Sequence, residues 1–219
     1  MASYFLSRME AHIGVDESGK GDFFGPLVVA ACYVGDEHLA ELDGVRDSKK
    51  LTDPVALRLA IQIKKTCPHA VIAIGPSKYN ELYSSFKNLN KLLAWGHARA
   101  IENVLEQQPS DLAISDQFAN PAELKRRLFE KGRTIRLESM VRAEADIAVA
   151  AASILARAEF LIRLKKLGEE FGFLLPKGAS AGVVDAGASF VRQFGAEKLS
   201  QVAKMHFKTT QNVMEKAGQ

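Results

Sequence analysis

The most chemically informative residues are two neighbouring acids, Asp16 and Glu17, within the glycine-rich stretch GVDESGKGDFFGP at residues 14–26. The stretch has the G-x-x-x-x-G-K spacing of a phosphate-binding loop, but Gly21 stands where that loop needs Ser or Thr to hold Mg²⁺. The two carboxylates would also repel a triphosphate, and a strand-like segment follows where the loop requires a helix. The sequence therefore argues against a nucleotide-binding loop.

A divalent metal ion is the partner that Asp16 and Glu17 favour. Both acids end an otherwise apolar, strand-like run, so one of them is expected to point toward the core side, where an unpaired carboxylate is costly. Mg²⁺ is the natural counter-ion for clustered oxygen ligands. The turn that follows, Gly19–Gly21, would let a sugar-phosphate backbone approach the main chain. A plain hairpin turn with an acidic lip remains the alternative for these glycines.

Asp116, Glu144 and Asp146 are the further acids that such a site needs. Asp116 ends a predicted buried strand, and Glu144 and Asp146 lie between the next predicted strand and an alanine-rich helix. Asp116 has the alternative role of a helix-cap or turn residue, and acids at the other two positions also favour the helix dipole. Three strand ends that each deliver a carboxylate indicate one shared site. In such a cluster, some carboxylate pKa values should rise in the metal-free state.

The predicted elements describe an α/β domain with a mixed sheet covered by helices. Apolar, β-branched runs on both sides of the glycine-rich turn predict a β-hairpin. Asp53-Pro54 and Asn120-Pro121 are typical helix starts. The expected strands span 12–16, 26–34, 69–76, 110–116 and 133–139; the expected helices span 53–65, 77–108, a segment from 120, and 146–172; a loop at 175–187 precedes one or two helices that reach about residue 213.

The composition is that of an ordinary globular protein. The 219 residues are 47% hydrophobic and 25% charged, and the net charge of +3 permits an anionic partner without requiring one. No apolar run of transmembrane length and no signal-peptide pattern occurs, which predicts a cytoplasmic protein. Cys32 and Cys67 are expected to be small buried apolar residues. Four histidines are expected to be structural: His12, His38, His69 and His97.

Seven segments, in order, resemble the type 2 ribonucleases H, and ribonuclease HIII most closely. They are DESGKGDFFGP, DSKKLTD, NLNKLLAWGHARAIE, SDQF, RAEADIAVAAASILAR, LPKGAS and KMHFKTT, and the match runs from about residue 12 to residue 210. The resemblance implies a ribonuclease H-like α/β fold with a mixed five-stranded sheet flanked by helices. We expect a single catalytic domain over residues 1–219, with 1–11 as a short lead and about 172–219 as a C-terminal loop and helices.

The same resemblance implies an endonuclease that hydrolyses the RNA strand of RNA–DNA hybrids and leaves 5′-phosphate and 3′-hydroxyl ends. The clustered acids predict that cleavage proceeds by two-metal-ion catalysis. It implies Mg²⁺ as the cofactor, with Mn²⁺ as a substitute, and a nucleic-acid partner; we expect a monomer with no membrane partner. The four catalytic and metal-binding carboxylates of the family fall on Asp16, Glu17, Asp116 and Glu144. Asp146 stays an alternative for the fourth, because the spacing from Glu144 to the Ala-Ala-Ser segment is shorter by about one residue than in the sister ribonucleases HII.

Eight residues match the family's substrate contacts. Gly19, Lys20 and Gly21 match a glycine-basic-glycine turn that contacts the RNA sugars around the scissile bond, where the 2′-hydroxyl distinguishes RNA from DNA. The others are expected to contact phosphates: Ser48, Lys49, Lys50, Asn88 and Lys177. For Asn88, a helix-capping role is an alternative of at least equal weight.

Two departures from the family pattern affect the expected substrate. Only about a dozen residues precede the first motif, so the extra N-terminal domain usual in ribonucleases HIII is expected to be absent. The C-terminal-region tyrosine with which ribonucleases HII recognise a lone ribonucleotide has no counterpart among the four tyrosines. We therefore expect stretches of RNA to be cut and single embedded ribonucleotides to be cut poorly. The alternative functions are a non-catalytic hybrid-binding protein and a two-metal nuclease of DNA junctions.

Overall fold

The centre of the structure is a five-stranded mixed sheet in the order β3-β2-β1-β4-β5. The computed structural model describes residues 10–45, 48–116, 120–141 and 143–218, without the side chains of Ser48 and Glu144. The strands are β1 (His12–Ser18), β2 (Leu27–Val34), β3 (His69–Ile74), β4 (Leu112–Asp116) and β5 (Arg136–Met140). β1–β2 and β2–β3 pair antiparallel, whereas β1–β4 and β4–β5 pair parallel. The predicted hairpin and mixed sheet are confirmed.

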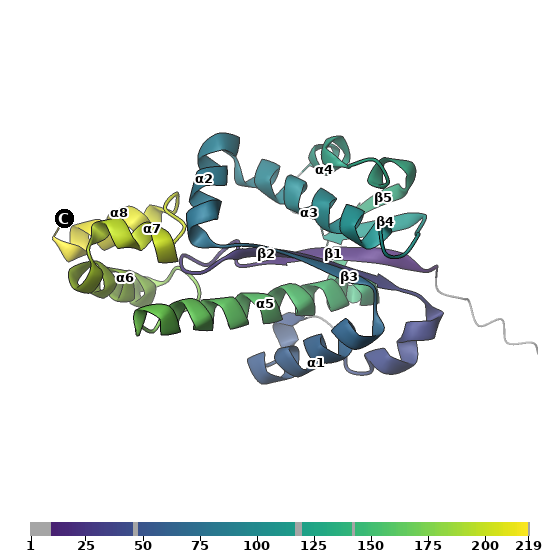
Figure 1. The fold of residues 1–219 in the computed structure, drawn as a ribbon, viewed down its shortest axis with the longest axis horizontal. Helices are drawn as coiled ribbons and strands as arrows, with labels where there is room; N and C mark the ends of the chain where they lie inside the picture. The colour runs from purple at the N-terminus through teal and green to yellow at the C-terminus, as the bar shows by residue number, and fades with distance from the viewer. Residues whose placement is uncertain (1–9, 46–47, 117–119, 142, 219) are drawn as a thin grey trace, which may run out of the picture.

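Helices cover both faces of this sheet, as Figure 1 shows. On one face lie α2 (Pro76–Phe86), α3 (Leu89–Leu105) and α4 (Pro121–Arg127), and on the other lie α1 (Asp53–Thr66) and α5 (Ile147–Phe171). α6 (Ala181–Phe194), α7 (Leu199–Val202) and α8 (Lys208–Ala217) gather beyond one end of the sheet. Short 3₁₀ turns span Asp36–Leu42, Ser48–Lys50, Gly132–Thr134, Ala143–Ala145 and Ala196–Lys198.

The alternation of side chains along β1 decides which face of the sheet each residue serves. Val15 packs in the core cluster that β1 and β2 share with α3. Gly14 faces α5, and this helix lies so near that a Cβ on Gly14 would meet the carbonyl carbon of Ala148 at 2.1 Å. By the same alternation, Asp16 continues the face of Gly14, and Glu17 continues the face of Val15. The two adjacent acids therefore serve opposite faces at the end of the strand.

The helical region predicted as one piece, residues 77–108, consists of two helices. α2 ends at Phe86, and the next residue, Lys87, adopts a left-handed backbone with φ of 51°. Such a residue ends a helix because the next N–H no longer points along the helix axis. The side-chain oxygen of Asn88 then accepts hydrogen bonds from the main-chain N–H groups of Asn90 (2.9 Å) and Lys91 (3.3 Å), which caps α3.

Two further predicted boundaries were wrong. The loop predicted to continue to residue 187 ends at Ser180, and α6 begins at Ala181. Its glycines and serine have weak helix propensity, but tertiary packing overrides propensity here, since Gly187 lies directly against Val213 of α8. The fifth strand begins at Arg136, because a 3₁₀ turn occupies Gly132–Thr134. After α5 the described chain contains three helices, where one or two were expected.

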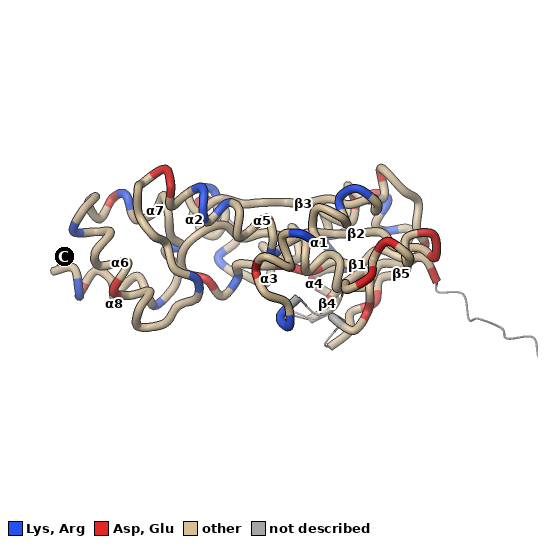
Figure 2. The backbone as a smooth tube through the Cα atoms, turned by 90° about the horizontal axis from the view of Figure 1, so that it is seen from below, with Lys and Arg blue, Asp and Glu red and all other residues tan. Residues whose placement is uncertain are grey.

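The cysteines, the charged residues and the lengths of the helices bear on the predictions made from composition. Cys32 and Cys67 are both buried and unoxidised. Basic and acidic residues are spread along the whole length of the backbone (Figure 2). Across the described ranges, none of the helices combines the length and the apolar character needed to cross a membrane.

Candidate metal and nucleic-acid site

Asp16 and Glu17 are held by two different helices, one on each face of the sheet. Asp16 accepts a hydrogen bond from the hydroxyl of Ser153 on α5, and its Oδ1 accepts another from the main-chain N–H of Glu17 at 2.8 Å. Glu17 Oε2 lies 2.9 Å from Nε2 of His97 on α3, a histidine with no exposed surface. Each carboxylate is thus oriented by a partner from its own side of the sheet.

Asp116 lies beside these acids because β4 runs parallel to β1. Val15 pairs with Ser115 in the register, so Asp16 and Asp116, which follow them, lie on neighbouring strands near the carboxyl ends of both. Asp116 Oδ1 also accepts a hydrogen bond from the main-chain N–H of Ala143 at 3.1 Å. This bond holds the 3₁₀ turn that contains Glu144 next to the Asp116 carboxylate. The side chain of Glu144 itself lies outside the described part of the chain.

Asp146, the alternative fourth acid, has a structural role at a different place. Its Oδ1 accepts the main-chain N–H of Val149 at 2.9 Å and so caps α5, and its Oδ2 lies 2.8 Å from His12 Nε2. His12 begins β1, whereas Asp16 comes four residues later, which is about 13 Å along an extended strand. The structure therefore separates Asp146 from the other carboxylates.

The three carboxylates described line one polar cavity of about 440 Å³. It is lined by Asp16, Glu17, Ser18, Gly19, Lys20, Gly21, Lys49, Asp116, Ser153 and Arg157. The glycine turn and the acids therefore meet in one place. Lys50 is exposed and does not line this cavity, and neither does Asn88, whose side chain caps α3. The predicted contact of Ser48 lies outside the described side chains.

The environments of Asp16 and Glu17 move their pKa values in opposite directions. Burial, followed by repulsion from Glu17, raises the pKa of Asp16 to about 7, and the Ser153 hydrogen bond only partly offsets this. Burial also acts to raise the pKa of Glu17, but the hydrogen bond and charge of His97, together with Lys20, lower it to about 2. Some of the carboxylate pKa values were expected to rise, and that of Asp16 does; the pKa of Glu17 falls instead, because Glu17 has His97 and Lys20 as partners.

Lys20 shows that these acids attract a cation jointly. Its Nζ lies 2.5 Å from Glu17 Oε1. Burial acts to lower the pKa of Lys20, but the charges of Glu17, Asp16 and Asp116 together raise it. Within the described residues, no group of three or more His, Cys, Asp or Glu side chains is arranged to hold a metal ion. In donor chemistry and charge, however, the carboxylates fit a hard divalent cation, and the Lys20 ammonium supplies that positive charge in this structure.

Three functional side chains were missed or misjudged from the sequence: His97, Ser153 and Arg157. His97 was expected to be structural, yet it contacts Glu17 from a helix 80 residues later in the chain, so local spacing held no signal. Ser153 and Arg157 did have a signal in the sequence. They are separated by one helical turn, and Ser153 is a polar residue at the end of an alanine run on the helix that packs against β1.

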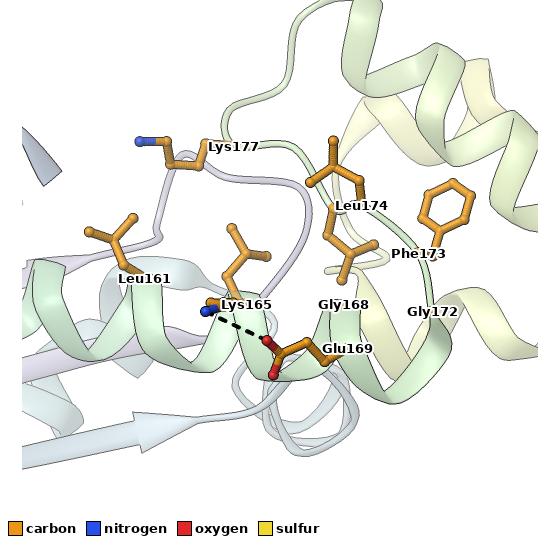
Figure 3. A pocket seen from close by; sticks show the side chains of 10 residues that line it. Leu161, Lys165, Gly168, Glu169, Gly172, Phe173, Leu174 and Lys177 are labelled. Carbon is orange, nitrogen blue, oxygen red and sulfur yellow. Dashed lines mark ion pairs between the residues drawn. The ribbon is translucent and has the colours of Figure 1, made fainter. Parts of the chain in front are cut away.

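Lys177 lies at the edge of the site and is already paired. Its Nζ donates to Asp53 Oδ2 at 2.6 Å, and the other oxygen of Asp53 accepts from Arg157 at 2.6 Å. Lys177 also borders a second cavity, of about 530 Å³, beside the C-terminal half of α5 (Figure 3). That cavity is lined mainly by leucines and Phe173, and its one carboxylate, Glu169, pairs with Lys165 at 3.7 Å. It offers no set of oxygen ligands, so the chemistry belongs to the smaller polar cavity.

Comparison with known proteins agrees with this arrangement of acids and glycines. The sequence profile of the family described as Ribonuclease HII matches residues 13–210. The chain belongs to the ribonuclease HII family. It is therefore a ribonuclease H, the class of enzyme that hydrolyses the RNA strand of RNA–DNA hybrids, and it has the ribonuclease H-like fold that was predicted.

Within the ribonuclease HII family, the chain is similar to proteins named ribonuclease HIII. It is 46% identical over 209 residues to ribonuclease HIII of Protochlamydia amoebophila, covering 94% of this chain and 69% of that protein. It is 46% identical over 226 residues to ribonuclease HIII of Chlamydia felis, covering 99% and 75%. The crystal structure of Bst-RNase HIII in complex with Mn²⁺ superposes with a TM-score of 0.87 at 39% identity, covering 94% of this chain and 70% of that one.

The pKa of Asp16 predicts a pH-dependent effect of Asp16→Asn in metal-free protein. An acid whose pKa rises on folding, here from 3.8 to about 7, stabilises the fold below its unfolded value and loses that contribution as the pH rises to its folded value. Asparagine does not ionise, so the variant does not lose this contribution. Relative to wild type, its free energy of unfolding should therefore be higher at pH 8 than at pH 5 by on the order of 2 kcal/mol. Urea denaturation in EDTA measures this, with the exposed-acid variant Asp111→Asn as control. An equal change at both pH values would contradict the assigned shift.

Proposed function

We propose that this ribonuclease H cleaves the RNA strand of RNA–DNA hybrids with Mg²⁺ as its cofactor and Mn²⁺ as a substitute, leaving 5′-phosphate and 3′-hydroxyl ends. The observation that carries the proposal is the meeting of Asp16, Glu17 and Asp116 with the Gly19–Gly21 turn in one polar cavity. The Mn²⁺ complex of the related Bst-RNase HIII supports a divalent metal ion as the cofactor. The pairing of acids with basic side chains in that cavity supports a phosphodiester substrate.

The proposed metal ligands are Asp16, Glu17, Asp116 and Glu144. Bound divalent metal would supply an activated water and would stabilise negative charge on the scissile phosphate and the leaving oxygen. Ser153 and His97 hold the carboxylates of Asp16 and Glu17 in fixed orientations, so little reorganisation is needed when a cation binds.

The basic residues of the cavity are the proposed phosphate contacts. Lys20, Lys49 and Arg157 line it, and Lys177 adjoins it through the carboxylate of Asp53. Guanidinium and ammonium groups are the side chains that bind phosphate oxygens, and those near a metal site can orient the strand that is cut. Lys20 would leave Glu17 for a phosphate once a metal ion neutralises the acids.

The two glycines of the turn have different reasons to be glycine. Gly19 has a φ of 86°, and a Cβ there would meet the carbonyl oxygen of Pro26 at 2.2 Å, so the fold itself requires it. A Cβ on Gly21 would meet nothing within 4 Å, and its backbone is not left-handed. Neither packing nor conformation requires Gly21, and unlike Gly75, which also faces open space, Gly21 lines the polar cavity; this supports a close approach by a ligand. An RNA sugar with its 2′-hydroxyl is the proposed ligand.

The direct test of the proposed function is a cleavage assay with labelled duplexes in Mg²⁺ and, separately, in Mn²⁺. The substrates are an RNA strand on DNA, a DNA duplex with one ribonucleotide, single-stranded RNA and all-DNA. Cleavage confined to the RNA–DNA hybrid is the expected result. Binding without cleavage would indicate a hybrid-binding protein, cleavage of DNA would indicate a different nuclease, and efficient cutting at a lone ribonucleotide would move the substrate toward that of ribonuclease HII.

Gly21→Ala should impair cleavage without harming the fold. The added methyl group meets open space, and Gly→Ala in a compatible conformation usually stabilises by about 0.4–1 kcal/mol. We expect kcat/KM on the hybrid to fall by about 10–100-fold, because the methyl group displaces the sugar from its reacting position. The matched control is Gly75→Ala, since Gly75 also has open space but does not line the cavity. Equal activity of the two variants would show that the turn does not touch the substrate.

Variants of Glu144 and Asp146 should separate the two candidates for the fourth acid. Glu144→Gln, like Asp116→Asn, is expected to reduce cleavage to below about 1% while folding and hybrid binding remain. Asp146→Asn should keep the α5 cap, since Asn caps as well as Asp, and should lose only the charged partner of His12. We therefore expect near-normal cleavage and a loss of about 1 kcal/mol of stability. The reverse pattern of cleavage rates would assign the fourth acid to Asp146.

A further inference from the structure

Lys204, in the segment between α7 and α8, is a lysine with no exposed surface. Burial lowers the pKa of its ammonium to about 7, although the charge of Asp22 acts in the opposite direction. Taking an ammonium group out of water is costly unless its protons are hydrogen-bonded. A lysine retained at such a position must therefore have partners that an apolar side chain could not satisfy.

The partners of Lys204 are main-chain carbonyls of one short loop. Its Nζ donates to the carbonyl oxygens of Asp22 at 2.7 Å, Gly25 at 2.8 Å and Phe24 at 3.4 Å. An ammonium group has three N–H donors, so these three acceptors match its full capacity. The ring of Tyr79 lies with its centroid 5.8 Å from Nζ and adds the attraction of an aromatic face for a cation.

The main chain around Lys204 also pairs with this loop, but it leaves those carbonyls to the side chain. Lys204 N–H donates to the Phe23 carbonyl at 2.9 Å, and Gly25 N–H donates to the Val202 carbonyl at 2.9 Å. Three carbonyl dipoles that converge on one point repel one another unless a cation lies between them. Without the ammonium, Asp22, Phe24 and Gly25 would have to rotate their carbonyls toward other donors, because buried carbonyls without partners are costly.

Rotation of these carbonyls would move the glycine turn, since Asp22 follows Gly21 directly. The segment after α5 also holds this loop: Asp22 Oδ1 accepts from Gly178 N–H at 2.6 Å, and Phe23 N–H donates to the Gly178 carbonyl at 2.9 Å. The loop is thus clamped between two parts of the chain more than 150 residues away. Of these two sets of contacts, only the one made by Lys204 involves a buried charged group.

We propose that Lys204 is a positioning residue for RNA cleavage: by binding the carbonyls of Asp22, Phe24 and Gly25, it sets the Gly19–Gly21 turn at its working distance from the carboxylates. The proposal rests on the proposed function, in which this turn contacts the RNA sugar. Lys204 lies under the loop and does not line the cavity, so it acts through the turn and touches no reacting atom.

A double-mutant cycle between Lys204→Met and Gly21→Ala tests this role. Methionine fills a similar volume but removes the charge and the donors, so the three carbonyls lose their partner and some loss of stability is expected. We expect Lys204→Met to stay folded and to lose at least about tenfold in kcat/KM on the hybrid, mainly in kcat, as a displaced turn would cause. If Lys204 acts only through the turn, the two losses should not multiply. The kcat/KM of the double variant should then lie at most about threefold below that of the poorer single variant. Lys204→Arg, which keeps charge and donors, should recover part of the loss.

Controls separate this role from a general effect on the fold. Lys198→Met removes an exposed lysine next to α7 and should leave kcat/KM unchanged. In a second double-mutant cycle, the fold-changes in kcat/KM caused by Lys204→Met and by Gly75→Ala should multiply, because the two residues act independently. If Lys204→Met unfolds the protein, Lys204→Gln replaces it, since the amide keeps two N–H donors without the charge.

Several outcomes would overturn the proposal. One is wild-type kcat/KM in Lys204→Met, and another is independent multiplication of the Lys204→Met and Gly21→Ala effects. Unfolding of both Lys204→Met and Lys204→Gln would do so too, because it would make Lys204 a requirement of the fold. Failure of the proposed function looks different: Gly21→Ala would then cleave the hybrid as well as wild type, or the wild type would not cleave it at all.

Discussion

Two carboxylates that are adjacent in the chain and largely removed from water at the end of one strand are the constraint on which the rest of the structure depends. β-strand alternation sends Asp16 toward α5 and Glu17 toward α3, so a single partner cannot satisfy both. Ser153 and His97 supply a donor from each side. Both helices must therefore lie close to β1, and the absence of a side chain at Gly14 allows α5 to do so.

This division of partners makes the two acids electrostatically unequal. Glu17 has a histidine and a lysine beside it and stays ionised, whereas Asp16 has only a hydroxyl and a main-chain N–H and is pushed toward neutrality. Two carboxyl groups at such short range cannot both ionise easily, so a cation that binds between them stabilises the doubly ionised pair. The position of the Lys20 ammonium, within the combined field of Glu17, Asp16 and Asp116, is the direct expression of that tendency.

The C-terminal helices complete the site by controlling the loop between β1 and β2. The loop that carries the glycine turn is bonded both to Gly178 and to the segment around Lys204. The site is thus assembled from the first hairpin, the ends of two parallel strands and the last part of the chain. A buried ammonium group loses stabilisation when it moves away from its acceptors. The contact of Lys204 with the loop therefore restricts the position of the loop more than an apolar contact would.

Much of this arrangement follows from the sequence because its causes are local. Asn120-Pro121 and Asp53-Pro54 begin helices where expected, since a cap or an N-terminal proline acts within one turn. The acids at the ends of β1 and β4 were predicted because apolar runs that end in a carboxylate can be read directly. The helix break at Lys87 was missed, because a single left-handed residue interrupts an apolar pattern that continues on both sides of it.

By itself, then, the sequence determined the family, the elements of the sheet and three of the acids, since these depend on residue type and short spacing. Only the tertiary structure decided that Asp146 serves His12, that His97 holds Glu17, and that Lys204 binds the loop after the glycine turn. The physical reason is common to all three. Each depends on which face of a strand or helix a side chain occupies and on partners 80 or more residues away, and both are set by packing and register.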